Sequence, residues 1–148
     1  MGRRTRNIYF TADWHIGHGN VLRLDQRPFA DLEAMNKGLI KRFNACVGEN
    51  DVCYFLGDMG FSTAAIKEVV DELNGTKILI LGNHDKKCQA MMNSGFDAVM
   101  YSASLYIAGE LVTMTHCPLR GVFREDTTGM RNSKPGDNWH RETDNYKY

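Results

Sequence analysis

Short apolar segments alternate with longer amphipathic segments, and this alternation limits the possible folds more than any other feature of the sequence. The apolar, β-prone segments are residues 8–12, 51–56 and 77–81. The amphipathic segments follow Asp31 and Ser62, residue types that can cap the start of a helix. Strands that alternate with helices along a chain predict an α/β fold with parallel strands.

The segments beyond residue 85 are shorter. A small helix is expected around residues 86–93, and two strands are expected at residues 98–107 and 111–115. The turn at Ala108-Gly109-Glu110 would join these strands into a hairpin and add an antiparallel element to the fold. Ligands of α/β sheets bind at the carboxyl ends of the strands, so the residues that follow each strand are the first candidates for a site.

The bulk composition favours a small protein of the cytoplasm. A chain of 148 residues can bury one core, so we expect a single domain over residues 1–148. The 18 basic and 18 acidic residues balance, which argues against nucleic acid or a membrane surface as partner. Four widely spaced cysteines indicate free thiols, and no apolar run is long enough for a membrane span or a signal peptide. The sequence predicts no particular oligomeric state.

Polar side chains follow the strands in a regular order. Asp13 and His15 follow the first strand, Asp58 follows the second, GNHD at residues 82–85 follows the third, and His116 follows the strand at 111–115. Each carboxylate or histidine alone could cap a turn or lie satisfied in a core. Together they form a set of oxygen and imidazole donors without thiolate, which suits Mn, Fe, Zn or Ni bound for catalysis. We therefore expect a metal site at this edge of the sheet.

The motifs that carry these residues resemble one known family. They are FTADWHIGHGN, RPF, YFLGD, LILGNHD and THCPL, read in chain order. In this combination they resemble the calcineurin-like metallophosphoesterases, and among these the small bacterial and phage phosphoesterases. The resemblance covers about residues 8–119. It implies an α/β fold in which a β-sandwich is flanked by helices, in αββα order.

The resemblance also implies a metal-ligand set. Asp13 and His15 would bind one metal ion, and Asp58 would bridge it to a second ion bound by Asn83 and His116. Two divalent cations are implied, with Mn²⁺ as the expected metal and Fe, Zn or Ni as alternatives. A hydroxide that bridges the metals would attack a phosphodiester or phosphomonoester, with a nucleotide-like substrate as one option.

Further roles follow for residues near these ligands. His84 would protonate the leaving oxygen, and Asp85 would orient its imidazole, an arrangement that suits a general acid. His18 and Asn20 in the IGHGN segment could contact the substrate phosphate, and Arg27 of the RPF loop could clamp it. An ordinary surface turn would explain His18 and Asn20 equally well, and a solvated loop arginine is the simpler explanation of Arg27.

One part of the family pattern is missing. The family closes with G-H-x-H, and no such motif occurs in this sequence. Truncation of a longer protein, substitution by His140, Asp137 or Asp144, and decay of the site would each explain this. We favour truncation, since five ligand residues are intact. The domain would then be incomplete at its C-terminus, could lack the C-terminal strands of the sandwich, and would bind metal poorly. The alternative function is a catalytically impaired scaffold with the same fold.

Overall fold

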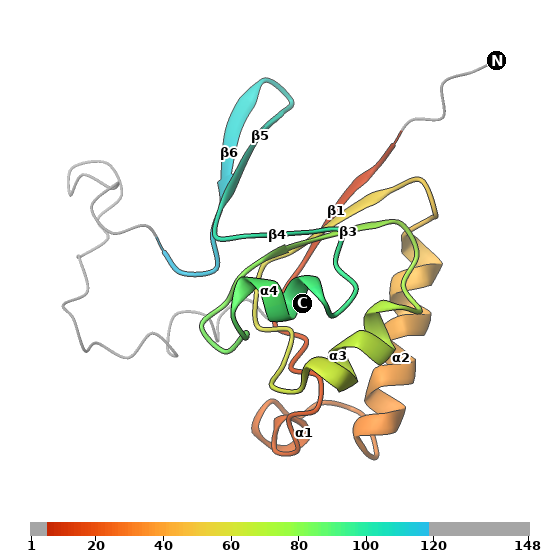
Figure 1. The fold of residues 1–148 in the computed structure, drawn as a ribbon. Coiled ribbons are helices and arrows are strands. Elements are labelled where there is room, and N and C mark those ends of the chain that lie inside the picture. Colours follow the sequence, from red (N-terminus) through yellow and green to blue (C-terminus); the bar gives the residue numbers. More distant parts are fainter. Residues whose placement is uncertain (1–5, 119–148) are drawn as a thin grey trace, which may run out of the picture. The chain divides into compact units, whose positions relative to one another are not determined.

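The computed structural model describes residues 6–118, which lie almost entirely in the compact unit Met1–Cys117. Its helices and strands are labelled in Figure 1. In chain order they are β1 (Ile8–Thr11), α1 (Val21–Leu24), α2 (Leu32–Cys46), β2 (Val52–Phe55), α3 (Thr63–Val70), β3 (Thr76–Ile80), α4 (Cys88–Met92), β4 (Ala98–Met100), β5 (Ala103–Ile107) and β6 (Glu110–Met114). None of the helices in this range is long and apolar enough to cross a membrane.

Four of the strands form a parallel sheet in the order β1-β2-β3-β4. Thr11 pairs with Phe55, and Phe55 pairs with Leu79, so the carboxyl ends of the first three strands are level. Strands β5 and β6 form a separate antiparallel hairpin. The segments that leave β1, β2 and β3 therefore emerge at one edge of the sheet.

The two faces of the sheet bury different cores, because successive side chains of a strand point to opposite faces. Cys53 and Phe55 of β2 belong to a core cluster shared with residues of α2, α3 and α4. Val52 and Tyr54 of the same strand belong to a second cluster, which includes Met114 of the hairpin. The helices thus cover one face, as Figure 1 shows, and the hairpin contributes to the other.

The predicted α/β class is confirmed, with a parallel sheet flanked by helices. Both predicted caps form: Asp31 accepts a hydrogen bond from Ala34 N at 2.7 Å, and Ser62 accepts one from Ala65 N at 3.3 Å. Within residues 6–118, the second sheet of the expected sandwich consists of the β5–β6 hairpin.

One strand prediction was wrong. Residues 98–107 do not form a single hairpin strand, because β4 continues the parallel sheet beside β3 while β5 pairs with β6. The chain leaves the sheet at Tyr101 and Ser102, between the two strands. No glycine or proline lies at this break. The sequence therefore shows one continuous β-prone run, although the chain passes from one sheet to the other within it.

Candidate metal centre

The loops that follow β1 and β2 are joined by backbone hydrogen bonds beyond the ends of the strands. These bonds run from Leu56 N to Thr11 O at 2.7 Å, Asp13 N to Gly57 O at 3.0 Å, His15 N to Asp58 O at 3.0 Å and Ile16 N to Met59 O at 2.7 Å. Asp13, His15 and Asp58 have positive φ angles of 57°, 54° and 56°. Left-handed backbone is uncommon for residues other than glycine and is often found at functional sites, where surrounding bonds hold it in place.

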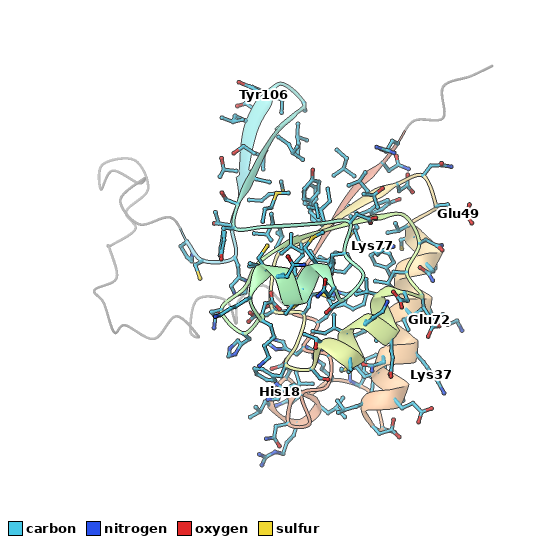
Figure 2. The ribbon with its side chains drawn as sticks, viewed as in Figure 1. His18, Lys37, Glu49, Glu72, Lys77 and Tyr106 are labelled. Atoms are coloured by element: carbon cyan, nitrogen blue, oxygen red, sulfur yellow. The ribbon has the colours of Figure 1, made fainter. Side chains whose placement is uncertain are left out.

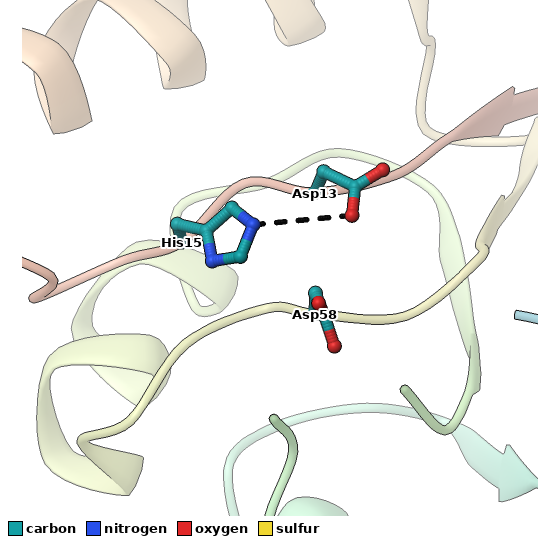
Figure 3. Close-up of side chains that lie close together, drawn as sticks. All are labelled: Asp13, His15 and Asp58. Carbon is teal, nitrogen blue, oxygen red and sulfur yellow. Dashed lines mark ion pairs between the residues drawn. The ribbon is translucent and has the colours of Figure 1, made fainter. Parts of the chain in front are cut away.

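Three of the predicted ligands lie together in these joined loops. Asp13, His15 and Asp58 each offer a ligand atom, and the three atoms lie within 4.8 Å of one another. Figure 3 shows the His15 ring facing the Asp13 carboxylate, with Nε2 3.9 Å from Oδ1 and Asp58 below them. The Asp58 side chain is only 6% exposed, so its carboxylate needs a compensating charge or hydrogen bonds in this position.

The surroundings of the cluster shift the pKa values of His15 and Asp13. Burial lowers the pKa of His15, with the carboxylates of Asp58 and Asp13 opposing this effect. Burial also raises the pKa of Asp13; His116 opposes the rise and the Asp58 carboxylate adds to it. Because the Asp13 side chain is 58% exposed, water screens these interactions. A neutral imidazole is the form that binds metal, so the direction of the His15 shift suits a ligand.

A second group of predicted ligands meets at the same aspartate. The Nε2 atom of His116 lies 2.9 Å from Asn83 Oδ1 and 3.4 Å from Asp58 Oδ1. The other ring nitrogen of His116, Nδ1, lies 2.7 Å from the carbonyl oxygen of Leu56. Since a carbonyl only accepts, Nδ1 carries the proton and a neutral ring has its lone pair on Nε2. A lone pair that faces two oxygens calls for a cation or a proton between them.

The donor set and its spacing fit a divalent cation. With ligand bonds of about 2.1 Å, neighbouring ligand atoms are about 3.0 Å apart in octahedral and about 3.4 Å apart in tetrahedral geometry. The His116–Asn83 and His116–Asp58 distances of 2.9 and 3.4 Å match these separations. The bond from His116 Nδ1 to a backbone carbonyl is the support that metal-binding histidines usually have. The cluster at Asp13 and His15 is more open.

His84 lies beside both groups without joining either as a close contact. Its Nε2 atom is 3.9 Å from Asp58 Oδ2, and its backbone N–H donates to Asp58 Oδ1 at 3.0 Å. The side chain is 38% exposed, so a bound molecule could reach the ring. The rings of His15 and Phe61 pack edge-on against it, with centroids 5.9 and 5.3 Å away.

No hydrogen bond or ion pair joins Asp85 to the His84 ring in the part of the chain that the structure describes, which corrects the prediction that Asp85 orients this imidazole. Its carboxylate instead accepts three backbone N–H groups, from Asp58 at 2.9 Å, Met59 at 2.7 Å and Gly82 at 2.8 Å. Asp85 therefore ties the loop after β3 to the loop after β2. It fixes the backbone that carries Asp58.

Arg27 is a second correction, because its guanidinium is not free to clamp a phosphate. It donates from Nη1 to Trp14 O at 2.7 Å and from Nη2 to Asp13 O at 2.8 Å. The remaining N–H groups face Asp25 Oδ2 and the sulfur of Met35. These contacts engage all the N–H donors that an arginine has. Arg27 thus holds the backbone of the loop that carries Asp13 and His15.

The other two predicted substrate contacts have different surroundings. His18, labelled in Figure 2, has its ring centroid 5.8 Å from that of His15 and 5.0 Å from that of Phe61. It therefore lies at the edge of the site. Asn20 is exposed at the start of α1 and makes no capping bond with its side chain. The structure gives Asn20 no contact with the site residues among those it describes.

Gly82 allows the loops to approach closely. A Cβ atom at this position would lie 2.2 Å from Asp58 Oδ1 and 2.4 Å from Asp58 N, distances at which atoms clash. The GNHD motif therefore needs its glycine because the loop passes so close to Asp58. The alternative ligands His140, Asp137 and Asp144 lie outside the described residues.

Comparisons with known proteins indicate the family of the chain. The calcineurin-like phosphoesterase family matches residues 6–142. The uncharacterized protein MJ1445 of Methanocaldococcus jannaschii is 44% identical over 84 residues, which cover 55% of this chain and 48% of that protein. The Gene 66 protein of Mycobacterium phage L5 is 37% identical over 86 residues, covering 53% and 40%, and that of phage D29 is 36% identical, covering 54% and 41%.

A solved structure shares the fold. It is the protein of unknown function AQ665 from Aquifex aeolicus, with a TM-score of 0.66 and 23% identity; the match covers 83% of this chain and 67% of that one. The matched region spans less than half the length of each of the three curated relatives. The family match, by contrast, extends over most of the sequence. The chain therefore belongs to the calcineurin-like phosphoesterase family.

Proposed function

We propose that this protein is a metal-dependent phosphoesterase whose site holds two divalent cations bridged by Asp58. The observation that carries the proposal is the position of Asp58 between two sets of donors. Its carboxylate shares one cluster with Asp13 and His15 and another with Asn83 and His116. A carboxylate has two oxygens and can serve both sets.

The metal would be bound only by oxygen and imidazole nitrogen. Such donors suit Mn²⁺, our first candidate, as well as Fe, Zn and Ni. When bound, two cations supply Lewis-acid activation of the attacking water and of the phosphoryl oxygens. The protein's own part is to keep the donors rigid, which it does through the joined loops and through the carboxylate of Asp85.

His84 is the proposed general acid. Its ring lies next to the Asp58 carboxylate and is open to solvent, so it can hold a proton beside the leaving oxygen of a bound phosphoester. A general acid matters most when the leaving group is a poor one. His84→Ala should therefore keep metal and slow the hydrolysis of esters with poor leaving groups more than that of activated esters.

The proposed substrate is a small phosphodiester or phosphomonoester, with a nucleotide-like molecule as one candidate. The test is hydrolysis of bis(4-nitrophenyl) phosphate and 4-nitrophenyl phosphate by the 148-residue protein, with and without added Mn²⁺. Asp58→Asn should abolish the metal-dependent rate. Asp71→Asn is the matched control, because this exposed carboxylate pairs with Lys67 on α3, and it should leave the rate unchanged.

Two results would contradict the proposal. One is turnover that does not depend on metal, and the other is equal turnover by Asp58→Asn and the wild type. A folded protein that binds divalent cations and hydrolyses neither ester would support the catalytically impaired scaffold instead.

A further inference from the structure

Phe61 lies beside the proposed general acid and leaves part of its ring exposed. Phe61 lies three residues after Asp58 in the sequence and is 39% exposed. Its ring meets those of His84 and His18 nearly at right angles, at interplanar angles of 88° and 86° and centroid distances of 5.3 and 5.0 Å. A single exposed apolar residue is ordinary on a protein surface. An apolar ring in contact with two imidazoles at a metal-ligand cluster is a more specific arrangement.

The backbone on both sides of Phe61 is fixed. Before it, Gly60 forms a β-bridge with Ile16, and a Cβ atom at Gly60 would lie 2.2 Å from the carbonyl oxygen of Ile16. After it, Ser62 caps helix α3 by accepting a hydrogen bond from Ala65 N. The ring therefore extends from a short segment held at both ends, which is how preorganised binding surfaces are built.

The position of the Phe61 ring relates it to the leaving group of a substrate. A leaving oxygen that takes a proton from His84 must lie within about 3 Å of the imidazole nitrogen. The group attached to that oxygen then lies close to the His84 ring, whose aromatic neighbours include His15 and Phe61. His15 belongs to the metal cluster, where the phosphoryl group would bind. A leaving group that extends away from this cluster can reach Phe61.

We propose that Phe61, together with His18, forms the wall of a leaving-group subsite that takes a flat aromatic group, such as an aryl or nucleobase ring. This inference rests on the proposed function, because it takes the phosphoryl position from the metal cluster. An aromatic side chain favours flat, apolar partners by stacking or edge contact and offers little to a small hydrated alcohol. The site would thus prefer aryl or nucleoside esters over alkyl esters of equal reactivity.

The test compares two methyl phosphodiesters whose leaving groups have similar acidity, one with phenol and one with a fluorinated isopropanol. Phe61→Ala should raise KM for the phenyl ester about 10-fold, the size of one stacking contact. It should change KM for the fluoroalkyl ester by less than about 2-fold by the same reasoning. Phe61→Leu keeps the apolar bulk without the flat ring and should fall between. Tyr106→Ala is the control, an exposed aromatic on the hairpin (Figure 2), and should change neither.

Binding of inert analogues provides a readout without turnover. Phenylphosphonate and methylphosphonate are titrated into the Mn²⁺-loaded wild type and Phe61→Ala by calorimetry. The proposal predicts a preference for phenylphosphonate in the wild type that is lost in the variant.

Equal losses for both esters would overturn the subsite, since Phe61 would then act only by positioning His84. Unchanged constants for the phenyl ester and phenylphosphonate would also overturn it. If the wild type hydrolyses neither ester, the proposed function fails, and the phosphonate titration still decides the subsite by itself.

Discussion

Replacing Asp85 tests what holds Asp58, the proposed bridging ligand, in place. The Asp85 carboxylate accepts backbone N–H bonds at 2.9 Å from Asp58, 2.7 Å from Met59 and 2.8 Å from Gly82. Two of these bonds end on Oδ2 and one on Oδ1. In Asp85→Asn the amide oxygen can keep the Oδ2 pair, and the NH₂ group then faces the Met59 N–H, donor against donor.

The expected magnitudes follow from this count. A hydrogen bond to a charged group is worth about 1.5–3 kcal/mol, so the lost Met59 bond should lower the free energy of unfolding by about 2 kcal/mol in Asp85→Asn. Asp85→Ala loses all three bonds and should lower it by about 4.5 kcal/mol or more, taking the lower end of this range for each bond. Outer partners of metal ligands typically change metal affinity about 10–100-fold, and we expect a weakening in this range for Mn²⁺ in Asp85→Asn.

The assay is calorimetric titration with Mn²⁺, combined with urea unfolding of the same samples. Asp97→Asn is the matched control, because Asp97 also accepts a backbone N–H, from Lys77 at 2.7 Å, but lies away from the ligands. The control should lose stability and keep its Mn²⁺ affinity. If Asp85→Asn binds Mn²⁺ as tightly as the wild type, Asp85 does not position Asp58. If Asp85→Asn slows the hydrolysis of esters with poor leaving groups and no others, Asp85 orients His84, as the sequence predicted.

Three further predictions concern the same framework. Gly82→Ala places a Cβ atom 2.2 Å from an oxygen of Asp58. We therefore expect the free energy of unfolding in urea to fall by about 1–3 kcal/mol and Mn²⁺ binding to weaken. Stability and Mn²⁺ affinity equal to those of the wild type would refute the close approach. Lysine in Arg27→Lys cannot bind both backbone carbonyls that Arg27 holds, so this variant should fold and bind Mn²⁺ about 10-fold more weakly. If the variant loses only phosphonate binding, Arg27 contacts the phosphate, as the sequence predicted. Backbone N–H groups of Gly48 and Asn7 lower the pKa of Asp51, so this carboxylate stabilises the fold above about pH 4, and the stabilisation is lost as pH falls through its folded-state pKa. Asp51→Asn should therefore flatten the dependence of unfolding free energy on pH below about pH 4, and an unchanged pH profile would refute this.

The clustering of the polar strand-end residues was predictable because the rule behind it is geometric. Parallel strands of similar register bring their carboxyl ends to one edge, so residues as distant as Asp13, Asp58 and Asn83 had to lie near one another once the strands were assigned. Both long helices were predictable for a similar reason. Their apolar spacing indicated a helix, and the capping residues Asp31 and Ser62 predicted where each helix begins.

The roles of Asp85 and Arg27 could not be read from the sequence, because they depend on the path of the loops. The left-handed backbone at Asp13 and Asp58 determines which N–H and C=O groups face these side chains. A motif names the residue but not its hydrogen-bond partner. Phe61 was missed because its exposure and its contacts with two imidazoles leave no pattern in the sequence.

We propose that Asp58 joins two metal-binding clusters, and titration of Mn²⁺ into the full-length protein is the direct test of this role. Two binding events are expected in the wild type. His116→Ala should remove one event and leave the other, while Asp58→Asn should weaken both. A single event that His116→Ala leaves unchanged, or two events that are indifferent to Asp58→Asn, would contradict the account.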